Sequence, residues 1–186
     1  MPDLTPNDFR WDGYFWKTTV RLDAWRGFQS RRGAYGSLDS AASSDGTVDV
    51  TFAPEGREEA PLREAEVELV RWAVRHEREM QNALLAALLP RYAALRAEPD
   101  YADAIEDELM PPVRDVDGFR PLIGLHSLNV HQIEKAGRPY VGFEFGCTWD
   151  DEHGLGVLMH GKRAVKIGGA DTAILLWIAR EDAASG

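Results

Sequence analysis

The sequence predicts an α+β protein in which an antiparallel sheet packs against two or three central helices. Three observations predict it: side chains alternate along segments in the first and last thirds, a helical pattern fills the middle, and turn signals join neighbouring segments. Strands, then helices, then strands favour α+β over a parallel array of alternating strands and helices. We expect an N-terminal arm over residues 1–13 and a single domain over residues 14–186.

The first part of the domain, residues 14–53, is expected to form strands. Residues 14–22 and 47–52 alternate apolar and polar side chains, which is typical of half-buried strands. Asp45-Gly46 directly precedes the second segment and is a strong hairpin signal.

The middle of the chain, residues 61–110, is expected to be helical. Pro61 suits the first position of a helix, and the apolar residues that follow recur at helical spacing. Pro90 cannot donate an intrahelical N–H and clashes with the preceding turn, so it predicts a kink or a restart, followed by a shorter helix to about Ala97. Residues 101–110 are expected to form a third, acidic helix that ends at Pro111-Pro112.

The last part, residues 122–180, is expected to contain strands and a terminal helix. The expected strands are residues 123–133, 140–149, 155–160 and 163–167. Gly161-Lys162 predicts a two-residue turn between the last two of these. Residues 172–180 are expected to be helical, with a buried strand as the alternative.

Composition and charge limit the classes of function. The net charge is −10, and residues 99–121 carry seven acids against two bases. This balance argues against general nucleic-acid binding and is compatible with a basic protein partner. No apolar run approaches the ~18 residues of a membrane span, and no secretory signal is visible at the N-terminus. A single cysteine, Cys147, leaves no intrachain disulfide, so we expect a cytoplasmic protein with a buried structural thiol.

Acidic residues of the expected third helix form the first candidate binding surface. Asp100, Asp103, Glu106 and Asp107 recur at spacings of three and four and would share one side of a helix. Such a side is either a solvated face or a docking face for a basic protein, since clustered charges speed association and select partners.

The turn at residues 149–154 is the second candidate site. Trp149, Asp150, Glu152 and His153 stand together in a tight connection between two expected strands, where recognition and chemistry often occur. In a structural interpretation the acids accept turn N–H groups, Gly154 supplies an unusual backbone angle, and the indole anchors the turn. In a recognition interpretation the same side chains bind a partner. In a catalytic interpretation Glu152 and His153 act as an acid/base pair, although no nucleophile motif accompanies them.

The spacing of potential ligands favours neither a metal nor a cofactor. No HxH or CxxC pair exists, and His126 and His131 differ by five residues, which places them on opposite sides of an unbroken strand. We expect no cofactor, and we expect His76 to be a core-edge histidine bonded to a neighbour.

The run from Cys147 to Val157, followed by Gly168-Gly169-Ala170-Asp171, resembles a family of uncharacterised small bacterial proteins with a W-D-x-E-H-G-x-G-V motif and a later G-G-A-D. The resemblance covers roughly the last third of the chain and carries no catalytic residues. Small cytosolic α+β proteins of this kind often act as immunity partners of secreted toxins, so it implies a protein-binding role.

Three functions therefore stand as hypotheses. The first is a non-enzymatic, toxin-neutralising binding protein that uses the acidic helix and the turn against a basic toxin. The second is a hydrolase, with or without a metal, in which Glu152 and His153 exchange protons. The third is an oligomeric structural module that associates through exposed aromatic residues such as Phe9, Trp11 and Phe15.

Overall fold

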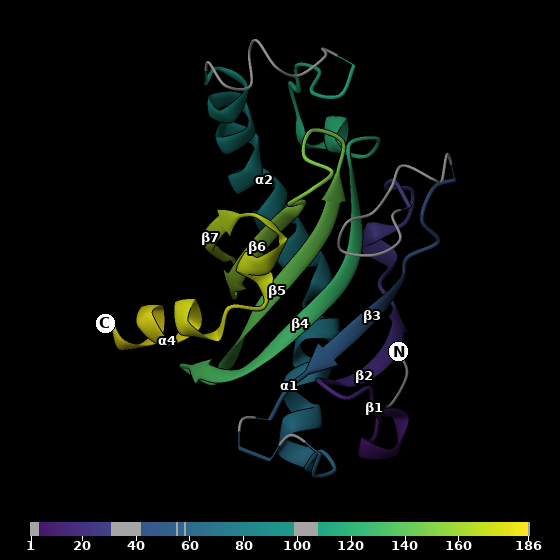
Figure 1. The fold of residues 1–186 in the computed structure, drawn as a ribbon, viewed down its shortest axis with the longest axis vertical. Coiled ribbons are helices and arrows are strands. Elements are labelled where there is room, and N and C mark those ends of the chain that lie inside the picture. The colour runs from purple at the N-terminus through teal and green to yellow at the C-terminus, as the bar shows by residue number, and fades with distance from the viewer. Residues whose placement is uncertain (1–3, 31–41, 55, 58, 99–107, 186) are drawn as a thin grey trace.

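Strands from both ends of the chain form one sheet that is covered by helices, as the sequence predicts for an α+β fold (Figure 1). The computed structural model describes residues 4–30, 42–54, 56–57, 59–98 and 108–185. The strands are β1 (Arg10–Trp11), β2 (Trp16–Arg21), β3 (Thr47–Phe52), β4 (Ile123–Lys135), β5 (Arg138–Cys147), β6 (Leu155–His160) and β7 (Arg163–Gly168). The α-helices are α1 (Glu64–Arg75), α2 (Glu77–Arg96) and α4 (Leu176–Ala184). Short 3₁₀ helices are η1 (Pro6–Asp8), η2 (Asp23–Trp25), η3 (Val116–Phe119) and η4 (Ala170–Ala173).

The strands lie in the sheet in the order in which they occur in the chain. Neighbouring strands are antiparallel except β3 and β4, which pair in parallel with Val50 opposite Leu128. The parallel pair occurs where the chain leaves the sheet, passes through α1 and α2, and returns, because parallel neighbours need such a crossover. The two groups of strands expected from the sequence therefore join into a single sheet.

The described part of the expected N-terminal arm packs on the domain. Leu4 and Phe9 are buried in the main core, and the Arg71 side chain of α1 donates to the Leu4 carbonyl oxygen with an Nε–O distance of 2.8 Å. Strand β1 pairs with β2, and Trp11 packs against Trp16 with ring centroids 5.9 Å apart. Because Phe9 is buried, the expectation that it is an exposed aromatic available for oligomerisation is wrong.

The long helical segment is interrupted at His76 and not at Pro90. His76 has φ −103° and ψ 11°, outside helical geometry, and its Nδ1 donates to the Trp72 carbonyl oxygen at 2.8 Å. Its ring stacks on Trp72, so it is the neighbour-bonded histidine at the core edge that the sequence predicts. Pro90 lies inside α2 on the exposed side, where water can hydrogen-bond the carbonyl that the proline leaves without a partner.

The face of the sheet opposite α1 and α2 carries η4 and α4 (Figure 1). The backbone of η4 lies directly on strand β5: a Cβ atom built on Gly142 would lie 1.8 Å from the Ala173 carbonyl oxygen. This contact explains why the C-terminal α-helix starts at Leu176, four residues later than the expected start at Thr172, which lies in η4.

Helix α4 is attached to the sheet by a charged cluster around Asp182. Its Oδ2 accepts hydrogen bonds from the Tyr140 hydroxyl at 2.7 Å and from the Arg163 guanidinium at 2.6 Å. The hydrogen bond from Arg163 lowers the pKa of Asp182 to about 2, and burial raises the pKa of Tyr140 to about 12. Both pKa shifts favour an ionised Asp182 and a protonated Tyr140 at neutral pH, which is the state that forms these hydrogen bonds.

A partly buried carboxyl joins α2 to η2. Glu77 accepts the Ala24 N–H at 3.1 Å, while Gln81 donates to the Ala24 carbonyl oxygen at 2.5 Å. The second carboxyl oxygen of Glu77 is buried without a hydrogen-bond partner among the described residues. Burial, partly offset by the Ala24 hydrogen bond, raises the pKa of Glu77 above its ordinary value of 4.5.

We expect Glu77→Gln to raise the free energy of unfolding at pH 7 by about 1 kcal/mol, because it removes an under-bonded buried charge while keeping an acceptor for Ala24. A raised folded-state pKa contributes stability that is lost as pH rises through it, so the gain should shrink toward pH 4. Urea unfolding across this range measures it. The control is Glu79→Gln, in which the substituted carboxylate is exposed and pairs with Lys162, so no gain in stability is expected at neutral pH. An equal gain in stability at pH 7 and at pH 4 would contradict a raised pKa for Glu77.

Candidate functional site

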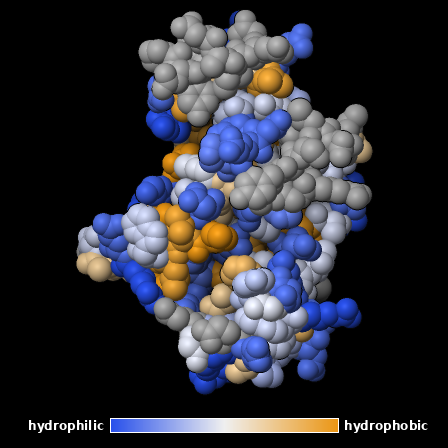
Figure 2. Space-filling view, in the orientation of Figure 1, coloured by the Kyte–Doolittle hydropathy of each residue, from blue (hydrophilic) through white to orange (hydrophobic). Residues whose placement is uncertain are grey.

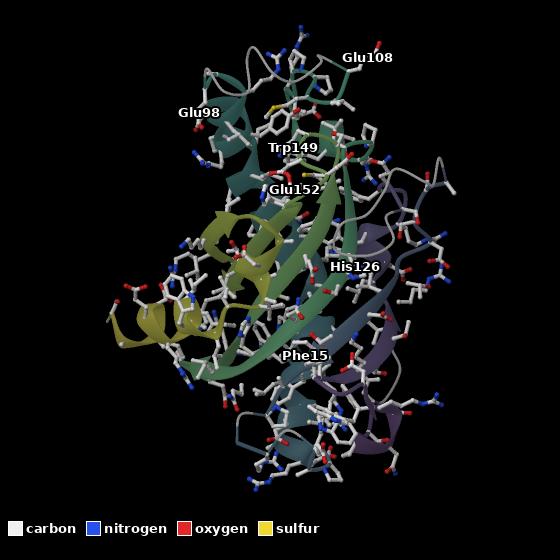
Figure 3. The ribbon with its side chains drawn as sticks, in the orientation of Figure 1. Phe15, Glu98, Glu108, His126, Trp149 and Glu152 are labelled. Atoms are coloured by element: carbon white, nitrogen blue, oxygen red, sulfur yellow. The ribbon has the colours of Figure 1, made fainter. Side chains whose placement is uncertain are left out.

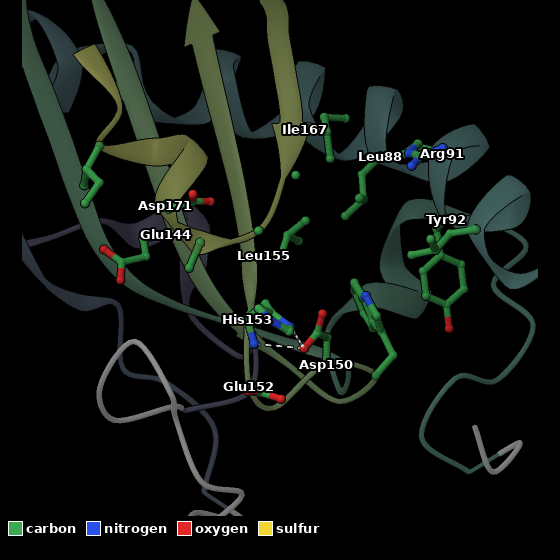
Figure 4. A pocket seen from close by; sticks show the side chains of 17 residues that line it. Leu88, Arg91, Tyr92, Glu144, Asp150, Glu152, His153, Leu155, Ile167 and Asp171 are labelled. Atoms are coloured by element: carbon green, nitrogen blue, oxygen red, sulfur yellow. Dashed lines mark hydrogen bonds and ion pairs between the residues drawn. The ribbon is translucent and has the colours of Figure 1, made fainter. Parts of the chain in front are cut away.

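Two segments that are separate in the sequence lie side by side at one end of the sheet (Figure 4). One is the β5–β6 turn at residues 149–154, and the other runs from the end of β7 into η4 at residues 168–171. The Ala170 N–H donates to the His153 carbonyl oxygen at 2.8 Å. A Cβ atom on Gly156 would lie 2.3 Å from the Gly169 carbonyl oxygen, so only glycine permits this approach. The two motif segments noted in the sequence therefore meet in space.

Together with α2, these segments enclose a pocket of about 660 Å³. One wall is apolar and is formed by the side chains of Leu88, Tyr92, Leu95, Trp149, Leu155, Ile167 and Ile174. The charged side chains at the pocket are the carboxylates of Glu144, Asp150, Glu152 and Asp171 and the guanidinium of Arg91. Arg91 forms an ion pair with Glu98 at 3.5 Å, so the pocket as a whole is acidic.

The surface around the pocket has a mixed character. Figure 2 shows hydrophobic surface in the middle of the face that carries η4, with polar side chains around it. Ile174, which lines the pocket, keeps 45% of its surface exposed. Contiguous apolar surface rimmed by polar side chains, rather than one exposed apolar side chain, marks a binding surface.

Asp150 organises the turn. Its Oδ1 accepts the His153 backbone N–H at 2.8 Å and lies 3.1 Å from His153 Nδ1. The Gly154 N–H donates to the Asp150 carbonyl oxygen at 3.0 Å, and Gly154 has φ 63°, the unusual backbone angle predicted for it. The Cys147 thiol, buried as predicted, also contacts the Asp150 carbonyl oxygen at 3.5 Å.

Trp149 connects the turn to the core. Its side chain is 7% exposed and packs edge-on against Tyr92 of α2 with ring centroids 5.0 Å apart. The Tyr92 hydroxyl donates to the Pro111 carbonyl oxygen at 2.8 Å, and burial raises the Tyr92 pKa to about 12, so the phenol stays protonated. The indole fixes the position of the turn, as expected for an anchor.

The acid/base pair expected from the sequence takes a different form. His153 contacts Asp150 and not Glu152, and its side chain is 69% exposed. Glu152 is exposed at the edge of the pocket, and among the described residues it has no hydrogen-bond or ion-pair partner. The two residues share the pocket without contacting each other through hydrogen bonds.

Sequence reasoning missed Glu144 as a site residue. Its Oε2 accepts the Ser127 hydroxyl at 2.6 Å, and Ser127 Oγ in turn accepts from the Asn129 amide at 3.2 Å. The Thr51 hydroxyl donates to Asn129, which extends this buried polar row from β5 across β4 to β3. The signal was present as polar residues at alternate positions of β4 (Ser127, Asn129), but only strand pairing shows that Ser127 lies opposite Glu144.

The four acids of the expected third helix, Asp100, Asp103, Glu106 and Asp107, lie outside the described residues. The described end of that segment, residues 108–110, forms a turn and a bend. Figure 3 shows Glu98 and Glu108, which flank the acidic segment, at the same end of the molecule as Trp149 and Glu152. Residues 109–111 pack here too: the Leu109 carbonyl oxygen accepts the Thr148 hydroxyl at 2.6 Å.

Within the described ranges, no group of three or more His, Cys, Asp or Glu side chains is arranged to hold a metal ion. His131 is buried, and its Nε2 donates to the Ala173 carbonyl oxygen at 2.8 Å, while burial lowers its pKa. His126 lies at a bulge in β4, so the simple alternation assumed for the two histidines does not hold along this strand. None of the helices in the described part of the chain is long and apolar enough to cross a membrane.

The fold and the pocket define an α+β protein with a sequentially ordered sheet and a ligand-sized acidic cavity at one end of it. Residues 17–175 match the family described as "Domain of unknown function (DUF6985)", and the chain belongs to this family. No curated protein matches the chain. No solved structure matches it either.

Proposed function

We propose that this protein is a binding module whose acidic pocket receives a basic side chain of a partner protein. The observation that carries the proposal is the combination of carboxylates and an apolar wall in one pocket of about 660 Å³. Lysine and arginine side chains have an apolar stem, which can pack on the apolar wall, and a charged head, which can pair with the carboxylates. The volume lies in the range of known ligand pockets, roughly 300–1,000 Å³.

Charge outside the pocket supports the same class of partner. The chain carries a net charge of −10, and a field of this sign attracts basic proteins and speeds their association. Glu98, which forms an ion pair with Arg91 of the pocket, precedes the acidic segment with Asp100, Asp103, Glu106 and Asp107, and we propose that segment as a second part of the docking surface. In the finer form of the proposal, the protein is a cytoplasmic immunity protein and its partner is a basic toxin.

Capture of the partner from native lysate of the source cells tests this proposal. We expect Glu152→Gln and Asp171→Asn each to reduce the partner recovered by about three- to tenfold at low salt, because each removes one carboxylate that pairs with the basic side chain. High salt should reduce the amount of partner that the unsubstituted protein captures. Charge reversal at Asp103 and Asp107 should slow association.

The matched control is Glu134→Gln, which removes one exposed carboxylate that does not line the pocket and should leave recovery unchanged. If all of these variants recover a partner equally well at both salt concentrations, the acidic pocket is not the binding site.

The Asp150–His153 contact favours a hydrolase as the second candidate. A carboxylate next to one imidazole nitrogen orients the ring, so the other nitrogen can act as a base in the pocket. Glu152 would then serve as the acid. Turnover of ester or phosphoester substrates that is abolished by both His153→Ala and Glu152→Gln, with folding intact, would favour this candidate over the binding module.

A further inference from the structure

A second pocket, of about 260 Å³, lies where the junction of α1 and α2 meets the turns after β4 and after β6. Trp72, His76 and Glu79 line it from the helical segment, and Arg138 at the start of β5 and Lys162 in the turn after β6 line it from the sheet. None of these residues lines the acidic pocket. Two full cations and one carboxylate give it an excess of positive charge, in contrast to the net charge of −10 on the chain.

Arg138 supplies the second cation, which attracts the Glu79 carboxylate without forming an ion pair with it. Its guanidinium lies beside the turn after β6, where a Cβ atom on Gly161 would be 3.3 Å from Nη1. Within the part of the chain that the structure describes, the guanidinium has no hydrogen-bond or ion-pair partner. An arginine fork offers paired N–H donors, whose geometry matches an oxyanion.

Lys162 and Glu79 form the other charged pair in the pocket. Their Nζ and Oε2 atoms are 3.0 Å apart, and the Lys162 side chain is 71% exposed. An exposed pair of this kind contributes little stability, so Lys162 can exchange the carboxylate for a ligand at low cost. Glu79 competes with any anion for the same cation.

His76 completes the polar wall. Its Nδ1–H donates to the Trp72 carbonyl oxygen, which fixes the ring and leaves Nε2 without a hydrogen-bond partner among the described residues. When protonated, the imidazole presents a third donor beside the two cations.

We propose that this pocket binds a phosphate-type oxyanion, with Arg138 as the principal ligand and Lys162 as the second. Two cations favour a doubly charged phosphate over a singly charged carboxylate. The site is independent of the acidic pocket, so either can be correct without the other.

Titration of the intact protein with inorganic phosphate, followed by amide NMR at constant ionic strength, tests this inference. We expect saturable shifts at the amides of Gly161 and Lys162, and acetate should bind several-fold more weakly. Arg138→Gln should weaken phosphate binding by at least about tenfold, since it removes the fork. Glu79→Gln should strengthen binding several-fold, because it removes the competing carboxylate.

The matched control, Arg114→Gln, removes an exposed guanidinium that does not line the pocket and should leave phosphate affinity unchanged. Absence of saturable shifts, an unchanged affinity in Arg138→Gln or in Glu79→Gln, or equal binding of phosphate and acetate would overturn the inference. Arg114→Gln changes the net charge by the same amount as Arg138→Gln, so a loss of affinity in Arg138→Gln alone distinguishes a built site from a general effect of net charge.

Discussion

Gly142→Ala should lower the free energy of unfolding by about 3 kcal/mol. The added Cβ would lie 1.8 Å from the Ala173 carbonyl oxygen and 2.6 Å from its carbonyl carbon, so η4 has to move off strand β5. Backbone cannot yield as a flexible side chain does, which makes this a severe overpacking. Urea unfolding measures the loss in the free energy of unfolding. A smaller near-ultraviolet circular dichroism signal should accompany it, because the C-terminal segment moves.

The control for this substitution is Gly137→Ala. Gly137 has φ 69°, and nothing lies within 4 Å of a Cβ built on it, so only backbone strain results. That strain costs about 1 kcal/mol. Equal losses in the two variants would mean that η4 does not lie on β5 as described.

Trp149→Ala should lower the free energy of unfolding by about 3–4 kcal/mol. It should also weaken the binding of any ligand in the acidic pocket. The indole is 7% exposed, packs against Tyr92 and forms part of the pocket wall, so its removal leaves a cavity and frees the turn that holds Asp150 and His153. Denaturant unfolding gives the first effect, and binding of the partner gives the second.

Trp177→Ala is the matched control because it removes the same side chain from a site that is 52% exposed. There the indole forms a cation–π contact with Lys166 at 5.0 Å, worth below about 1 kcal/mol at an exposed site. A loss at Trp149 no larger than that at Trp177 would contradict the role of Trp149 as an anchor.

Local patterns in the sequence were sufficient for several elements. Residues 47–52 and 155–160 have the predicted strand bounds, because side chains alternate along the first segment and Leu155, Val157 and Met159 align along the second. The α+β class followed from the order of these patterns and is confirmed. The helix break was predicted at Pro90, and this prediction was wrong because Pro90 faces solvent. The break lies at His76, whose ring stacks on Trp72, and this contact between neighbouring turns gives no local signal in the sequence.

The candidate site could be predicted only in part. Trp149, Asp150, Glu152 and His153 were selected from their density in one turn, and all of them line the acidic pocket. Glu144 and Asp171 were not selected, because their place in the pocket depends on strand pairing and on the close contact of Gly156 with Gly169. Such contacts join residues far apart in the chain and leave no periodic signal in the sequence.

The turn at residues 149–154 and the segment at residues 168–171 line one pocket, and we propose that this pocket binds a basic side chain. The most direct measurement is an amide NMR titration with N-acetyl-arginine amide, with the neutral isostere N-acetyl-citrulline amide as the control. We expect saturable shifts at Gly154, Gly168 and the Trp149 indole with the arginine compound, and weaker shifts in Glu152→Gln. Equal responses to both compounds, or shifts confined to other parts of the molecule, would contradict it.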